Sequence, residues 1–262
     1  MFSDEKPIIY RYNQLGEVIC QLRFPVILTI DSRPPAEFQE LIRDAFPQFQ
    51  SMKELPAPKI VGAPGNFSLD SQPATINYQF TSADGKWRIN LTNTFISLSC
   101  AQYKDWETFA GKLDKPLAAF IQVYKPAYFE RVGLRYLNFI SRKALCLEDV
   151  AFRELIQPPY LGVLGMDDFQ ESSALRSSVD AEFAISGGCR VNIHAGPGFI
   201  KRPNLDDNEL KFIFDQDLYM AGNIPVNYSA GSLQTLHSQA YSIFRNAITD
   251  QLHNAMDPTE KE

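Results

Sequence analysis

The chain has 262 residues, of which 45% are hydrophobic and 21% are charged, the composition of a globular protein with a full core. Its formal net charge of -6 argues against a general nucleic-acid binder, which needs a strongly basic surface. No apolar run approaches the roughly 18 residues of a membrane span, so we expect no membrane association.

The start of the chain and the cysteines indicate a cytoplasmic protein. Residues 1–17 lack the basic stretch followed by an apolar stretch that marks a signal peptide. The four cysteines lie far apart in the sequence, and most sit in apolar, strand-like surroundings; they are Cys20, Cys100, Cys146 and Cys189. We expect reduced core thiols and no metal site, because a metal site would need a close pair of ligands.

In the first half, alternating apolar residues predict a strand over Glu17–Phe24. Pro34-Pro35 begins a predicted helix that ends at Pro47, and residues 51–65 are expected to form a loop with a short edge strand near Ile60. Three strands and a closing helix follow; the strands are Thr75–Phe80, Lys86–Leu91 and Phe95–Ser99, and the helix is Lys104–Val123.

The strongest strand signal is Tyr128–Ser141, near the midpoint of the chain. At period two, Arg131, Gly133 and Arg135 share one face, and Gly133 leaves space above the backbone between the two arginines. One interpretation is a patch that recognises a small anion or a backbone. The alternative is a solvated sheet face whose arginines pair with nearby acids.

The second half continues with a predicted helix over Leu147–Ile156, a short strand over Tyr160–Leu164 and an acidic loop. The remaining strands are expected at Val179–Ile185, Cys189–Ala195 and Leu210–Leu218. A long helix then runs to about Met256, with Ser232 as its N-cap.

Both halves therefore follow the order β-α-β-β-β-β-α. Gly85–Leu91 (GKWRINL) is similar to Gly188–Ile193 (GCRVNI), which favours an internal duplication. We predict an α+β protein of two tandem repeats, residues 1–126 and 127–262, packed as one pseudo-two-fold unit. Each repeat would be an antiparallel sheet covered by a long C-terminal helix, an order analogous to the TATA-binding-protein-like and helix-grip architectures.

Corresponding strands of the two repeats carry polar residues that form the candidate binding site. Besides Arg131 and Arg135, the candidates are Arg88, Arg190, Asn192 and His194. If the two sheets join, these groups could converge on a concave surface. The alternative is that they are the solvated sides of two sheets.

No motif points to catalysis or to a cofactor. Asp215 and Asp217 lie two residues apart on a strand and are weak candidates for holding Mg²⁺. The Gly-Ser pair that nucleotidyltransferases place before such carboxylates comes after them here, at Gly231-Ser232. No nucleophile elbow, Cys–His signature, phosphate-binding loop or dinucleotide fingerprint is present, so we expect no cofactor and lean toward a non-enzyme.

Several stretches resemble a sporadically distributed, largely uncharacterised bacterial family of about 250 residues. The matching stretches span nearly the whole chain; they are LGEVICQLRFP, FQELIRDAFPQFQ, YKDWETF, RVGLRYLNFI and LHSQAYSIFRNAIT. The resemblance supplies no catalytic residues. Patchy distribution is typical of mobile or defence-associated genes, so the resemblance implies a role of that kind.

Three functions follow as hypotheses. The first is a cytosolic protein-binding or sensor module, the partner or antitoxin of a bacterial defence or toxin system, in which an acidic chain masks a basic partner. The second is an enzyme or sensor that binds a small phosphorylated ligand through the arginines. The third is a chaperone-like homo-oligomer that binds unfolded segments through an exposed apolar patch.

Overall fold

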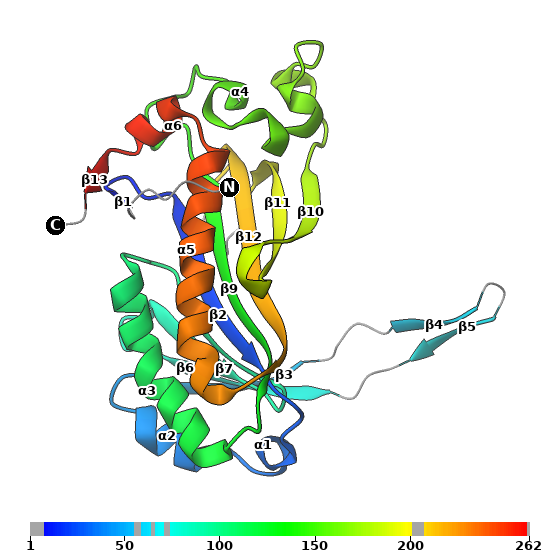
Figure 1. Cartoon of the computed structure of the whole chain (residues 1–262), viewed down its shortest axis with the longest axis vertical. Coiled ribbons are helices and arrows are strands. Elements are labelled where there is room, and N and C mark those ends of the chain that lie inside the picture. The colour runs from blue at the N-terminus through cyan, green and yellow to red at the C-terminus, as the bar shows by residue number, and fades with distance from the viewer. Residues whose placement is uncertain (1–7, 55–58, 64–65, 71–73, 201–206, 261–262) are drawn as a thin grey trace.

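One antiparallel sheet of nine strands runs through the molecule (Figure 1). The computed structural model describes residues 8–54, 59–63, 66–70, 74–200 and 207–260. In order across the sheet, the strands are β10 (Val179–Ala184), β11 (Arg190–Phe199), β12 (Leu210–Ile224), β9 (Phe129–Ile140), β2 (Leu15–Arg23), β8 (Phe95–Cys100), β7 (Trp87–Leu91), β6 (Thr75–Thr81) and β3 (Gln48–Glu54). The prediction of an α+β fold with antiparallel strands is confirmed, and these strands form one large sheet.

The two halves of the chain meet at the centre of this sheet, where β2 pairs with β9. Their register places Cys20 opposite Leu134. Outward from this seam, the first half contributes β8, β7, β6 and then β3 at the edge, and the second half contributes β12, β11 and β10. The halves therefore share one sheet and add their strands in the same order, while their interpretation as duplicated repeats stays a prediction.

Period-two alternation divides the side chains of the central strands between two faces. On β2, β9 and β12, one set of residues, including Leu22, Leu134 and Leu218, is fully buried. The intervening residues point to the opposite face. The alternation that predicted these strands therefore also determines which side of the sheet holds the core.

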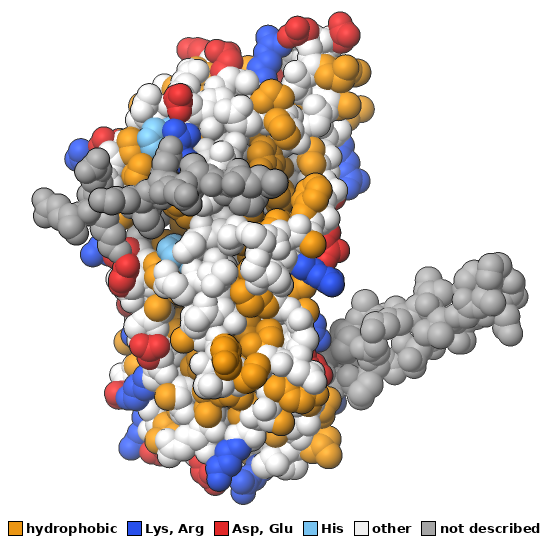
Figure 2. All heavy atoms as spheres, viewed as in Figure 1, with side chains coloured by type: hydrophobic (Ala, Val, Ile, Leu, Met, Phe, Trp, Pro, Cys, Tyr) orange, Lys and Arg blue, Asp and Glu red, His pale blue; other side chains and the backbone are white. Residues whose placement is uncertain are grey.

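Two long helices cover the apolar face (Figure 1). α3 (Trp106–Tyr124) and α5 (Ser229–Ala247) lie on the same side of the sheet, and α5 packs against β9 and β12. α3 begins after Asp105, whose carboxylate accepts a hydrogen bond from the Thr108 amide at 2.7 Å. Figure 2 shows this helix side, where charged groups lie mainly along the outline and hydrophobic groups along the middle.

Smaller elements complete the fold. The short helices are α1 (Leu28–Ser32), α2 (Ala36–Ile42), α4 (Phe152–Leu155) and α6 (Asp250–Ala255). Two two-stranded antiparallel pairs lie outside the main sheet: β1 (Ile8–Tyr10) pairs with β13 (Pro258–Glu260), and β4 (Lys59–Ala63) pairs with β5 (Asn66–Asp70). The β4–β5 pair extends away from the body of the molecule (Figure 1), and β4 confirms the short strand expected near Ile60.

Two predictions between residues 147 and 164 are wrong. Only Phe152–Leu155 of the expected Leu147–Ile156 helix is helical. The strand expected at Tyr160–Leu164 is replaced by 3-10 turns at Pro158–Tyr160 and Gly162–Gly165. A proline at the first turn presets a helical φ, which favours such a turn over a strand.

The long closing helix differs from its prediction at both ends. It begins at Ser229, not after a cap at Ser232, and it stops at Ala247. Ile248 is extended and forms a β-bridge with Ile156, and Thr249 then caps α6 by accepting a hydrogen bond from the Leu252 amide. A side-chain cap competes with helix continuation, which explains the break.

Candidate functional site: the open face of the sheet

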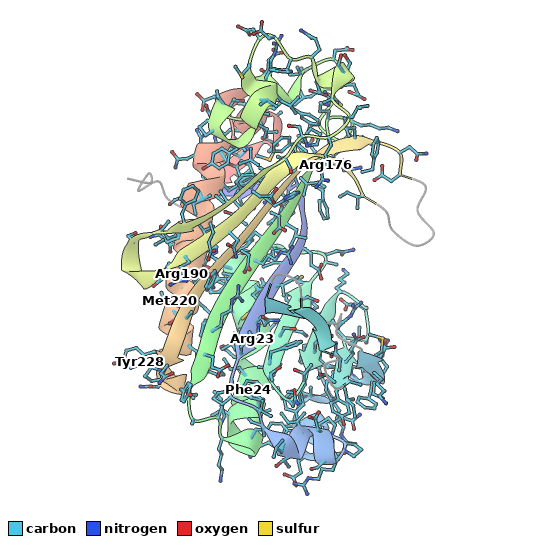
Figure 3. All side chains as sticks on the ribbon, turned by 90° about the vertical axis from the view of Figure 1, so that its right-hand side faces the viewer. Arg23, Phe24, Arg176, Arg190, Met220 and Tyr228 are labelled. Atoms are coloured by element: carbon cyan, nitrogen blue, oxygen red, sulfur yellow. The ribbon has the colours of Figure 1, made fainter. Side chains whose placement is uncertain are left out.

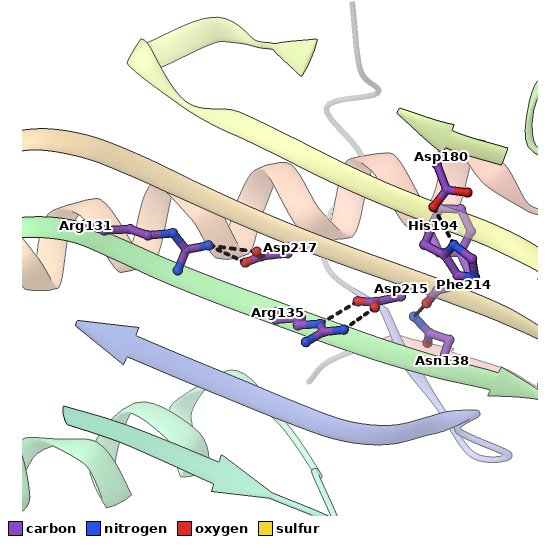
Figure 4. Close-up of polar contacts among 8 residues, drawn as sticks. All are labelled: Arg131, Arg135, Asn138, Asp180, His194, Phe214, Asp215 and Asp217. Atoms are coloured by element: carbon purple, nitrogen blue, oxygen red, sulfur yellow. Dashed lines mark hydrogen bonds and ion pairs between the residues drawn. The ribbon is translucent and has the colours of Figure 1, made fainter. Parts of the chain in front are cut away.

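The candidate residues lie on the sheet face away from α5. In Figure 3, strands β11, β12, β9 and β2 lie in front of α5, with Arg190 on β11 and Arg23 on β2. Figure 4 shows Arg131 and Arg135 on the near side of β9, with the helix behind the sheet. Their neighbour Tyr136 points the other way, because its hydroxyl bonds Nδ1 of His237 on α5 at 2.8 Å. We call the side that carries the two arginines the open face.

Each of the two arginines is paired with an aspartate of β12 (Figure 4). Nη2 of Arg131 lies 2.7 and 2.8 Å from the two carboxylate oxygens of Asp217. Arg135 donates from Nε and Nη2 to Asp215 at 2.8 and 2.5 Å. These hydrogen bonds with Asp215 raise the pKa of Arg135 above its ordinary value. Of the two interpretations of these arginines, an anion- or backbone-recognition patch or a sheet face with paired charges, the structure therefore favours the paired charges.

Sheet register explains how these pairs form. Asp217 lies directly opposite Arg135 on β9, yet each arginine reaches diagonally along the sheet to its own aspartate. The guanidinium of Arg131 lies over Gly133, so a Cβ added at Gly133 would be only 2.1 Å from Nη1 of Arg131. The same guanidinium lies 4.6 Å from the ring centroid of Tyr219. The space above Gly133 is thus filled by the arginine side chain.

A histidine–aspartate hydrogen bond continues this row across the sheet. Nδ1 of His194 on β11 lies 2.6 Å from a carboxylate oxygen of Asp180 on β10. The hydrogen bond from His194 lowers the pKa of Asp180. Next to it, Asn192 and Arg190 are exposed on the same side of β11. His194 is therefore half of a solvated pair on the sheet surface.

The predicted convergence of arginines from both halves is not seen. Arg88 is exposed on the open face, but β7 lies three strand positions from β9, or roughly 14 Å at about 4.8 Å per strand. Arg190 lies two positions from β9 on the other side. Among the described residues, neither arginine has an acidic partner. The sheet places the six candidates on one face without gathering them into one anion site.

The middle of the second-half face is instead acidic. A shallow hollow there is lined by four carboxylates and one guanidinium, those of Asp180, Glu182, Asp215, Asp217 and Arg135. The other lining residues are Ala181, Asn192, Ile193 and His194. The hydroxyl of Tyr219 donates to Glu182 at its edge. Arg131, the partner of Asp217, adds a second guanidinium, so four carboxylates face two guanidinium groups. The hollow therefore suits a cationic group.

The carboxylates of this hollow do not resemble a metal site. Both oxygens of Asp215 and both of Asp217 already accept hydrogen bonds from arginines. Within the described ranges, no group of three or more His, Cys, Asp or Glu side chains is arranged to hold a metal ion. Asp215 and Asp217 are therefore ion-pair partners of Arg135 and Arg131 in this structure.

A cavity of about 180 Å³ lies on the helix side of the same two strands. Its walls include aromatic residues from β1, β9, α3, α5 and the segment before α3, which are Tyr10, Tyr136, Trp106, His237, Tyr241, Phe244 and Tyr103. The sequence patterns did not predict this cavity. The available signal was the group of aromatic residues just before and within Lys104–Val123, together with His237 on the helical stripe that faces the sheet.

Comparisons with known proteins complete this description. Protein-family models, curated proteins and solved structures were each searched with this chain, and none of the three searches gave a match. In the part of the chain that the structure describes, no helix is both long enough and apolar enough to cross a bilayer. The resemblance to a sporadically distributed bacterial family stays a prediction.

Proposed function

We propose that this chain is a cytosolic, non-enzymatic binding module that recognises a basic partner protein through its open sheet face. The observation that supports this most is the acidic hollow between β10 and β9 on a face that α3 and α5 leave uncovered. Arginine and lysine side chains of a partner would find carboxylates there, of which Asp180 is well exposed. A partner or antitoxin in a bacterial defence or toxin system fits this chemistry.

The same geometry makes the phosphorylated-ligand hypothesis less favourable. The two arginines that would bind a phosphate already carry bidentate or near-bidentate aspartate partners. A phosphate would have to displace those carboxylates while close to their negative charge, which opposes binding. For this reason we prefer a cationic partner to an anionic ligand.

The strand order supports a second, structural proposal. Each half adds its strands outward from the β2–β9 seam in the same order, which is the arrangement expected of a duplicated unit related by a pseudo-two-fold axis. On this proposal, the hollow is an elaboration of the second repeat. Its counterpart in the first half is a neutral row in which Asn90 donates to Ser97 at 3.3 Å and Gln50 donates to Gln79 at 2.5 Å.

The test is native mass spectrometry of the protein purified from its own host with the neighbouring genes intact. We expect a defined basic polypeptide at fixed stoichiometry. A Glu182→Lys variant should lose this polypeptide, because it places a positive charge in the hollow. An Asp114→Lys variant should retain it, because this exposed residue lies on α3 and changes the net charge equally.

Other outcomes would contradict the proposal in distinct ways. A retained small phosphorylated molecule without a protein partner would favour the second hypothesis. A bare homo-oligomer that binds unrelated unfolded chains would favour the third. Equal loss of the partner in both charge variants would show that overall charge, and not the hollow, directs binding.

A further inference from the structure

The cavity beneath α5 has the size and walls of a small-molecule site. Its volume is about 180 Å³. For comparison, an engineered apolar cavity of about 150 Å³ in another protein holds benzene. The cavity therefore has room for one or two fused rings.

The aromatic side chains around it are held in fixed orientations. Trp106 stacks on His237 with ring centroids 4.6 Å apart and an interplanar angle of 7°. The indole Nε1 of Trp106 donates to Gln234 at 2.6 Å. Tyr103 meets Tyr136 edge to face at 5.9 Å. Flat walls whose own polar atoms are already bonded to each other favour a flat, largely apolar guest.

One polar group at the floor of the cavity has no such bond. Gln216 lies on β12, lines the cavity and is only 2% exposed. Its Oε1 is buried and accepts no hydrogen bond from any described residue. A buried acceptor without a donor is costly to the folded state, so its natural complement is an N–H or O–H group of a bound molecule.

The cavity offers little to a charged ligand. The charged residues among the lining side chains are Lys104, Asp105 and Glu107, and all three lie where the chain enters α3. Asp105 is occupied as the helix cap. On the opposite wall, Nδ1 of His237 is bonded to the Tyr136 hydroxyl. Apart from these three residues, the described lining has no Asp, Glu, Lys or Arg side chain, and aromatic side chains are its largest group.

We propose that this cavity binds a neutral, planar heteroaromatic molecule of one or two rings that donates an N–H hydrogen bond to Gln216. Indoles and uncharged nucleobases belong to this class. The site is separate from the open face and does not depend on the proposed partner. It lies behind the ion-pair row, because Tyr136 and Gln216 alternate along their strands with Arg135, Asp215 and Asp217.

The test uses two probes of almost the same shape, indole and benzofuran, with the full chain and isothermal titration calorimetry. Benzofuran has an oxygen in place of the indole N–H, so it cannot donate to Gln216. We expect indole to bind at least about tenfold more tightly than benzofuran. Binding of neither probe, or equal binding of both, would overturn the proposal.

Two variants and one control variant assign the effect to the cavity. Gln216→Leu should make the two probes equal, and a persistent preference for indole would overturn the role of Gln216. Ala240→Leu should abolish binding of both, because Ala240 lines the cavity from α5 and is almost fully buried. Ala230→Leu makes the same change at an exposed position of α5 and should leave binding unchanged. Undiminished binding in Ala240→Leu would place the probes elsewhere and overturn the proposal.

Discussion

Replacing Gly133 with alanine should displace the Arg131 side chain from its ion pair. A Cβ at this position would lie 2.1 Å from Nη1 and 2.8 Å from Cζ of Arg131. The guanidinium would have to move by more than an ångström to reach ordinary contact distance. Because its bonds to Asp217 are 2.7 and 2.8 Å long, such a movement breaks or badly distorts them.

The expected cost follows from what the arginine loses and what the backbone gains. The pair is mostly buried, with side-chain exposures of 19% for Arg131 and 28% for Asp217, and the guanidinium also stacks on Tyr219. We assign these contacts about 1–2 kcal/mol together. Alanine restricts the unfolded chain, and it can adopt the backbone conformation of Gly133 because the φ of Gly133 is not positive. This contribution stabilises the fold by about 0.4–1 kcal/mol. The net destabilisation should be about 0.5–1 kcal/mol.

The assay is urea unfolding of the full chain in a double-mutant cycle with Arg131→Ala. Once the guanidinium is absent, Gly133→Ala should stabilise the protein by about 0.4–1 kcal/mol, so the sign of its effect reverses. If Gly133→Ala is neutral or stabilising in both backgrounds, the guanidinium does not lie over Gly133 as described, and the reasoning is refuted.

Three further predictions concern stability. Gly16→Ala should cost about 1–3 kcal/mol, because its Cβ would lie 2.1 Å from ring carbons of Phe139, and urea unfolding should show most of this cost removed in a Phe139→Ala background. Asp105→Ala should cost about 1 kcal/mol through loss of the α3 cap, seen as a lower thermal midpoint. Glu209→Gln should lower the free energy of unfolding at pH 7 by about 1 kcal/mol, and this effect should shrink as the pH falls through the folded pKa of Glu209.

The last prediction depends on the direction of a pKa shift. Burial raises the pKa of Glu209, but hydrogen bonds from Lys211, from the Lys143 amide and from Ser141 outweigh it, so the net shift is downward. A carboxyl group with a lowered pKa stabilises the fold above its unfolded pKa and loses that contribution as pH falls through the folded value. Urea unfolding of both proteins across this range measures the difference, and a pH-independent effect of Glu209→Gln would contradict it.

Strands with clear alternation could be predicted from the sequence, and so could their buried faces. β3 could not, because Gln48–Glu54 has no alternating apolar pattern, and its Phe49 and Met52 are 46% and 43% exposed at the sheet edge. The ion pairs on the open face join residues 80 and 86 positions apart. Local patterns carry no information about which residues so distant in the sequence become neighbours.

The cavity escaped prediction for a related reason. Its walls come from segments that begin at Ile8 and end at Met256, so it exists only after helices and sheet have packed. In sequence, Gln216 lies between Asp215 and Asp217 and therefore looks like a solvated side chain. Its burial is evident only once α5 lies across β12.

The central β2–β9 seam also affects the order in which the chain can fold as it is synthesised. β2 is complete at Arg23, but β9 does not begin until Phe129, so about a hundred residues are made before the seam can close. At about 5–20 residues per second, one edge of β2 stays unpaired for several seconds or longer. Its buried positions, such as Val18 and Leu22, are apolar, and unpaired apolar edges recruit other strands. A nascent first half therefore has a specific reason to need protection until β9 emerges.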